Sequence, residues 1–110
     1  MLQGEFTSIG YNSLSLIEIS NITEDKIKIK GISLWGTNTE APRTGEIELI
    51  LNSLGDEYIF LGDGMNTPKQ FILTVQNNNQ LTIHEHGYMG VYGLNVTFSG
   101  NYERVKNNVF

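Results

Sequence analysis

Two histidines in the segment His84-Glu85-His86 stand two residues apart, a spacing that places both imidazoles on one face of a strand. Two imidazoles can chelate a transition metal when a third ligand lies nearby. Alternation puts the pair on the face of Thr82, opposite Leu81 and Ile83, so we expect both rings to face solvent. No second cluster of His, Cys or Asp offers the remaining ligands, and the sequence therefore predicts neither a metal nor a cofactor.

Two arginines are candidates for binding an anion or an aromatic ring. Arg43 lies in a polar loop, where a guanidinium can clamp a carboxylate or a phosphate but is more often solvated. Arg104 follows Tyr102 on the inward face of the last strand. We expect it to pack over an aromatic ring at the open end of a barrel, with Trp35 as the stacking partner.

The other polar residues form no arrangement typical of catalysis. Gly62-Asp63-Gly64 lacks the strand and helix that flank a phosphate-binding glycine loop, and no serine is accompanied by a recognisable His and Asp. The absence of cysteine excludes a disulfide framework, cysteine zinc sites and thiol catalysis. We therefore predict that the protein is not an enzyme.

Acidic residues are concentrated in one part of the sequence. Seven Lys and Arg against twelve Asp and Glu give a net charge of -5, the wrong sign for binding nucleic-acid phosphates. The segment from residue 40 to residue 63 carries this whole charge, while the rest of the chain sums to zero. Its acids are Glu40, Glu46, Glu48, Asp56, Glu57 and Asp63. Such a face either only keeps the protein soluble or steers a basic partner into place.

Strands must position these residues, because apolar side chains recur with a period of two along most of the chain. A length of 110 residues fits one domain, residues 1–110. About eight strands follow one another: 2–8, 14–22, 26–35, 45–51, 57–61, 71–76, one from 81, and 94–103. Since parallel strands would need crossover helices, we expect an all-β fold, either a single antiparallel up-and-down barrel or a curled sandwich.

Two strands carry more detailed expectations. Ile27 and Ile29 share one parity, whereas Ile32 and Leu34 have the other, which predicts a bulge or sharp bend at Gly31. In the last strand, residues 94, 96, 98, 100 and 102 share the inward face.

Three stretches carry a family resemblance: TGEIE at 44–48, LTIHE at 81–85 and GLNVTFSGNYERV at 93–105. They resemble small secreted or lipid-anchored bacterial proteins with a calycin-like barrel, in which a TGEIEG-type strand precedes a closing NVTFxGxY strand. The resemblance implies a calycin or lipocalin-like barrel closed by an arginine, here Arg104, and brings no defined chemistry with it. Such proteins often have cysteines before the sixth and the last strand, whereas 67–70 and 88–91 have none.

The missing cysteines also bear on the compartment. Residues 1–6 have neither the basic region nor the apolar run of a signal peptide, so we expect a cytoplasmic protein. No window approaches the roughly 18 apolar residues of a membrane span, and neither a membrane nor nucleic acid is expected as a partner.

These observations favour a binding module. We expect an immunity protein that occludes the active site of a cognate bacterial toxin, a basic nuclease of the contact-dependent inhibition type. The acids named above would face the toxin's lysines and arginines, with Tyr58 as an aromatic anchor. Two alternatives stay open: a carrier of an apolar molecule, which requires small inward side chains, and a secreted inhibitor resembling the periplasmic lysozyme-inhibitor barrels. The oligomeric state is left open.

Overall fold

The computed structural model describes residues 2–10, 13–36, 43–62, 69–86 and 97–105. These residues form eight antiparallel strands: β1 (Gly4–Gly10), β2 (Ser13–Thr23), β3 (Lys26–Trp35), β4 (Arg43–Leu54), β5 (Glu57–Leu61), β6 (Gln70–Asn77), β7 (Gln80–His86) and β8 (Gly100–Arg104). Each strand pairs with the next, and β8 returns to β1, so that the barrel is closed. The predicted all-β antiparallel barrel is confirmed. The described residues contain no helix, and hence none long and apolar enough to cross a membrane.

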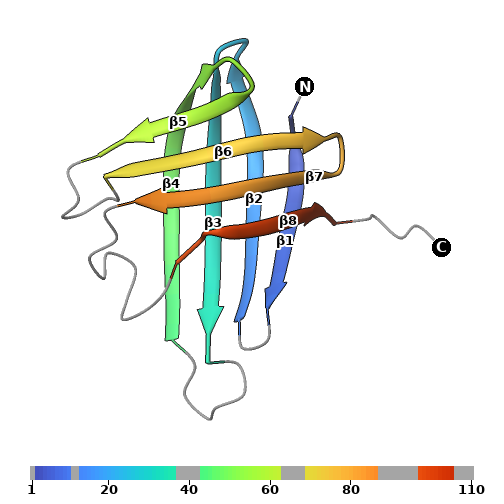
Figure 1. The fold of residues 1–110 in the computed structure, drawn as a ribbon, viewed down its shortest axis with the longest axis vertical. Helices are drawn as coiled ribbons and strands as arrows, with labels where there is room; N and C mark the ends of the chain where they lie inside the picture. Colours follow the sequence, from blue (N-terminus) through green and yellow to red (C-terminus); the bar gives the residue numbers. More distant parts are fainter. Residues whose placement is uncertain (1, 11–12, 37–42, 63–68, 87–96, 106–110) are drawn as a thin grey trace.

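The barrel consists of two curved sheets whose strands cross steeply, with β1–β4 behind and β5–β8 in front (Figure 1). Two short pairings join the sheets. β4 pairs with β5 only through Asn52, Ser53 and Leu54, and β1 pairs with β8 only through Phe6 and Thr7. Within each sheet the pairing is longer, and β3 pairs with β4 along its whole length. The two corners of the barrel therefore have its shortest ladders.

Side chains fill the interior of the barrel, because every second residue of each strand points inward. Four aromatic side chains are fully buried there: Phe6, Phe71, Phe98 and Tyr102. Aliphatic residues from both sheets surround them, among them Ile17, Ile19, Ile27, Ile29, Leu51, Leu73 and Leu81. These inward side chains are bulky, whereas a barrel that carries a ligand requires small ones.

The predicted bulge at Gly31 is wrong. β3 pairs with β2 and β4 without a break at this residue, so Ser33 is buried while Ile32 is 38% exposed on the outer face. Gly31 instead allows close packing against the core, because a Cβ here would lie only 2.9 Å from both Ile17 Cγ2 and Phe98 Cε2. The change of parity therefore marks apolar side chains on the outer surface rather than a bulge.

The last strand is shorter than the predicted strand over 94–103. β8 begins at Gly100, residues 97–99 have no strand structure, and residues 94–96 lie outside the described residues. The predicted inward face holds for Phe98 and Tyr102, which are fully buried. Instead of ladder bonds, residues 97–99 make hydrogen bonds with the carboxylate and the backbone N–H of Glu85.

Candidate functional site

The turns of an up-and-down barrel alternate between its two ends. One end carries the β2–β3, β4–β5 and β6–β7 turns, together with the start of β1 and the end of β8 (Figure 1). We call it the turn end. The other end receives the chain as it leaves β1, β3, β5 and β7, and we call it the loop end.

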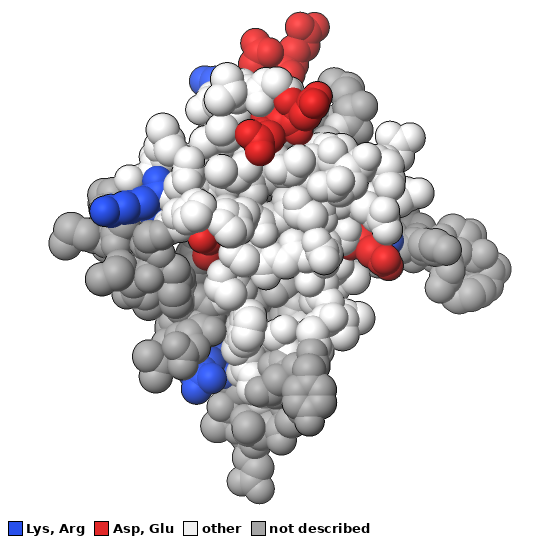
Figure 2. Space-filling model, viewed as in Figure 1, with Lys and Arg blue, Asp and Glu red and all other residues white. Residues whose placement is uncertain are grey.

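Four acidic residues gather at the turn end: Glu24 and Asp25 from the β2–β3 turn, Asp56 from the β4–β5 turn, and Glu57, the first residue of β5. The backbone N–H of Ser53 donates to the Asp25 carbonyl oxygen at 2.7 Å, which holds the two turns side by side. Figure 2 shows acidic side chains gathered at this part of the molecule, at the top of the view. We call these four residues the acidic cluster.

Sequence reasoning had identified only half of the acidic cluster. Asp56 and Glu57 were predicted as site residues, whereas Glu24 and Asp25 were missed. The two turns meet because the pairing of β3 with β4 places Lys26, the first residue of β3, opposite Asn52 near the end of β4. The signal that was available is that two acidic hairpin turns flank one predicted strand pair, which an antiparallel register brings to the same end.

Tyr58, the predicted aromatic anchor, follows the acidic cluster on β5. Its side chain is half-buried against the core and lines a groove of about 360 Å³ at the turn end. The other lining residues are Leu2, Gly55, Asp56, Val75, Asn77, Asn78 and Arg104. The walls of the groove are mixed: the apolar side chains of Leu2 and Val75 and the ring of Tyr58 lie beside Asn77, Asn78, the acid Asp56 and the cation Arg104. A groove of this size can receive one side chain of a partner.

The remaining predicted acids do not join this cluster. Glu46 and Glu48 lie on the outer face of β4, and extended strand places Glu48 about 20 Å from Leu54, where the turn begins. Glu40 and Asp63 lie outside the described residues. The structure therefore brings together Asp56, Glu57 and Tyr58, and separates them from Glu46 and Glu48.

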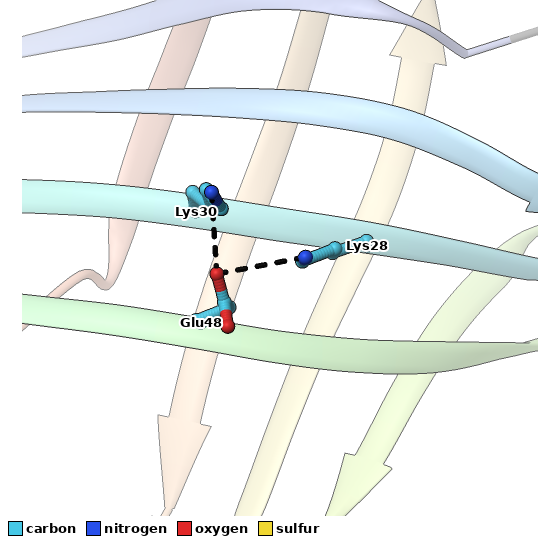
Figure 3. A network of polar contacts seen from close by, with 3 residues as sticks. All are labelled: Lys28, Lys30 and Glu48. Atoms are coloured by element: carbon cyan, nitrogen blue, oxygen red, sulfur yellow. Dashed lines mark ion pairs between the residues drawn. The ribbon is translucent and has the colours of Figure 1, made fainter.

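Glu48 is neutralised by two lysines of the neighbouring strand β3. Its Oε1 atom lies 3.4 Å from Lys30 Nζ and 3.6 Å from Lys28 Nζ (Figure 3). The hydrogen bond from Lys30 and the charge of Lys28 hold the pKa of the Glu48 carboxyl below its ordinary value. The acids at 40–63 are thus not an isolated negative face, because part of their charge is balanced across the sheet.

Arg104 closes the turn end. Its guanidinium carbon lies 4.6 Å from the centroid of the Phe6 ring. Nε and Nη2 donate to the Asn78 carbonyl oxygen at 2.9 and 2.7 Å, and Nη1 donates to the Gln3 carbonyl oxygen at 2.6 Å. The predicted packing over an aromatic ring is confirmed, but the ring is Phe6 and not Trp35.

The loop end is organised by the carboxylate of Glu85, which is only 9% exposed. Glu85 Oε1 accepts the backbone N–H of Phe98 at 3.1 Å, and Oε2 accepts the Thr97 hydroxyl at 3.0 Å. The backbone N–H of Glu85 donates to Ser99 Oγ at 3.0 Å. Sequence reasoning missed Glu85 because it considered only the flanking histidines, although alternation places this residue on the inward face of β7.

Trp35 belongs to the same polar network. Its Nε1 donates to Ser33 Oγ at 2.9 Å and to the Thr97 carbonyl oxygen at 3.1 Å. Ser33 Oγ in turn lies 2.6 Å from Ser15 Oγ, and both serines are buried. The network thus ties β2 and β3 to the segment that precedes β8.

Tyr102 links this network to the aromatic core. Its hydroxyl donates to the Phe98 carbonyl oxygen at 2.8 Å. Burial raises the pKa of the Tyr102 phenol well above its ordinary value, and the charge of Glu85 acts in the same direction. The phenol therefore stays protonated and serves as a structural donor.

The other residues considered for chemistry lie at the surface. His84 and His86 are exposed, as predicted, and their ring centroids are 4.3 Å apart in an edge-to-face contact. Within the described ranges, no three His, Cys, Asp or Glu residues are grouped to hold a metal ion. Arg43, predicted in a loop, is the first residue of β4 and is exposed.

Fold and site together define a closed eight-stranded antiparallel barrel with an arginine at one end and an acidic cluster beside it. No known family model matches the chain, and no curated protein or solved structure is significantly similar to it. The function is therefore inferred from the geometry of the chain itself.

Proposed function

We propose that the protein is an immunity protein that neutralises a basic nuclease-type bacterial toxin by covering its active site. The acidic cluster is the observation that supports this most directly. It presents four carboxylates at two neighbouring turns and the start of β5, and the hydrogen bond from Ser53 to Asp25 holds these turns in place. A nuclease cleft binds phosphates through lysine and arginine, so an acidic surface of matching size can enter it and keep nucleic acid out.

In this proposal, the groove beside the acidic cluster binds an anchoring side chain of the toxin and so makes the contact specific. Acidic residues at a rim accelerate and orient association, whereas an anchored side chain in a pocket supplies most of the affinity. In the proposal, one toxin side chain enters the groove between Tyr58 and Val75, and Asp56 pairs with a neighbouring basic residue. Binding is stoichiometric and needs no catalytic group, and its place is the cytoplasm, where a delivered nuclease acts.

The filled interior favours recognition by the outer surface over transport of an apolar molecule. Phe6, Phe71, Phe98 and Tyr102 occupy the space that such a ligand would need.

Charge reversal tests the proposal. The double variant Asp56→Lys with Glu57→Lys should weaken binding to the proposed basic toxin domain by more than about tenfold, measured by calorimetric titration. The matched control is Glu5→Lys with Glu18→Lys, which changes the net charge equally on the exposed outer face of β1 and β2. Unchanged affinity of the first variant, or equal losses in both, would remove the acidic cluster from the interface.

A further inference from the structure

Most of β4 has a neighbouring strand on one side only. β4 is the longest strand, and it pairs with β3 from Arg43 to Asn52. Its pairing with β5 covers only Asn52 to Leu54. Between Arg43 and Leu51, therefore, the described part of the chain places no strand along the second edge of β4.

The backbone groups that face this edge can be assigned from the register. Residues of an antiparallel strand direct their N–H and C=O groups alternately to one side and the other. The N–H of Ser53 donates to the Asp25 carbonyl oxygen on the β3 side. The N–H and C=O groups of odd-numbered β4 residues therefore point toward β3, and those of even-numbered residues point to the opposite side. Asn52 and Leu54 use this side to pair with β5. The even-numbered residues left without a strand partner in the described ranges are Thr44, Glu46, Glu48 and Ile50.

An apolar groove continues this edge toward the corner of the barrel. It has a volume of about 740 Å³ and opens where β5 turns away from β4. Aliphatic side chains on its walls are strongly exposed, Ile50 by 49%, Leu54 by 65% and Leu61 by 71%. A long unpaired edge next to exposed apolar side chains is a template for another strand, which proteins that do not use it usually block.

We propose that this edge of β4 binds an extended segment of a partner protein, which pairs with β4 as an additional strand. The backbone of the segment would bond to the N–H and C=O groups of Glu46, Glu48 and Ile50, the mode of recognition known as strand addition. This surface is separate from the acidic cluster, and the inference holds whether or not the protein neutralises a toxin.

The side chains of β4 specify the chemistry of the segment. Its residue beside Ile50 is apolar and enters the groove, while its residue beside Glu46 is basic, because side chains directly across a strand pair interact. Glu48 already shares two lysines, whereas no ion pair involves Glu46 within the described ranges. The partner segment therefore alternates in polarity and carries a lysine or arginine four residues from an aliphatic residue.

A second copy of the chain suits the edge poorly. Antiparallel pairing of two β4 edges about their centre at Ile47 would set Glu46 of one copy opposite Glu48 of the other. Like charges directly opposite each other destabilise a strand pair. Charge thus favours a different protein with a basic segment.

A synthetic peptide can test the edge in the intact protein. The peptide spans the length from Thr44 to Ile50, alternates in polarity, and carries a lysine and a leucine spaced like Glu46 and Ile50. Titration followed by NMR should show saturable binding and at least about tenfold slower hydrogen exchange of the Glu46, Glu48 and Ile50 amides. The same peptide with N-methyl groups on the residues that face β4 should bind at least about tenfold more weakly, because it cannot donate.

Two variants at one position separate backbone from charge. Glu46→Pro removes an edge N–H without touching the β3 ladder, a position where proline is tolerated, and should abolish peptide binding. Glu46→Thr keeps the N–H and should weaken binding only about threefold by removing the charge. The variant pair Asp56→Lys with Glu57→Lys should bind the peptide as the unchanged protein does, which separates this test from that of the acidic cluster.

Three results would overturn the proposal: equal binding of the N-methylated peptide, binding without protection of the three edge amides, or a dimer in sedimentation whose β4 amides are already protected. The last result would assign the edge to a second copy. Should Glu46→Pro fail to fold, as judged by circular dichroism, the two peptides on the unchanged protein still decide the question.

Discussion

The two ends of the barrel are each closed by one ionisable side chain bound to backbone groups, but the two side chains carry opposite charges. At the turn end, Arg104 donates to the carbonyl oxygens of Gln3 and Asn78. At the loop end, Glu85 accepts from the Phe98 N–H and the Thr97 hydroxyl. The arginine is half-buried beside solvent, whereas the glutamate is 9% exposed. Water can replace the bonds of Arg104 far more easily than those of Glu85.

The largest loss in the free energy of unfolding is therefore expected from a substitution at the loop end. Glu85→Ala should lower the free energy of unfolding by about 2 to 3 kcal/mol, because the buried Phe98 N–H loses its acceptor. Urea denaturation measures the change. The control Glu85→Gln retains one acceptor oxygen and should cost less than Glu85→Ala. If Glu85→Ala lowered the free energy of unfolding by less than Arg104→Ala does, the expected difference between the two ends would be contradicted.

A smaller loss is expected at the turn end. Arg104→Ala should lower the free energy of unfolding by about 1 to 2 kcal/mol, through the bonds to Asn78 and the contact with Phe6. Arg104→Lys keeps the charge over the ring but not the forked bonds, and should recover only part of the loss. Full recovery by lysine in the same urea titration would mean that charge alone closes this end.

The smallest effect on stability is expected at Glu48, whose carboxylate is exposed on the outer face of β4 and belongs to neither end of the barrel. Its pKa in the folded protein is lowered from the ordinary value of 4.5, so its contribution to stability is present above that value and disappears as pH falls through the lowered pKa. An NMR pH titration should show this low pKa, and Lys30→Ala should raise it toward 4.5. Lys26→Ala, a lysine outside the ion pair, should leave it unchanged.

Alternation along the chain was sufficient to predict the fold, since it reports which residues face inward. It failed at Gly31, where apolar side chains lie on the outer face, and in 97–99, where Glu85 replaces the strand ladder. Alternation also says nothing about which end of a strand is near which neighbour. Trp35 ends β3 at the loop end and Arg104 ends β8 at the turn end, so the predicted stacking between them could not form.

The candidate site was predictable only in part, for a related reason. Asp56, Glu57 and Tyr58 are contiguous, and composition alone marks them. Glu24 and Asp25 become their neighbours through the pairing of β3 with β4, which a charge count along the sequence leaves out. To find acidic residues that become neighbours in the fold, it is therefore better to group charges by the end of the barrel at which their strands or turns lie than by position along the sequence.

Trp35 is the single tryptophan of the chain, and its indole N–H is bonded within the loop end. Its fluorescence is consequently a built-in optical reporter for that end alone. A partner that docks on the turn end should leave the emission wavelength unchanged, whereas detachment of the segment at 97–99 should expose the indole and shift its emission to the red. Binding and opening can thus be followed separately in one unlabelled sample.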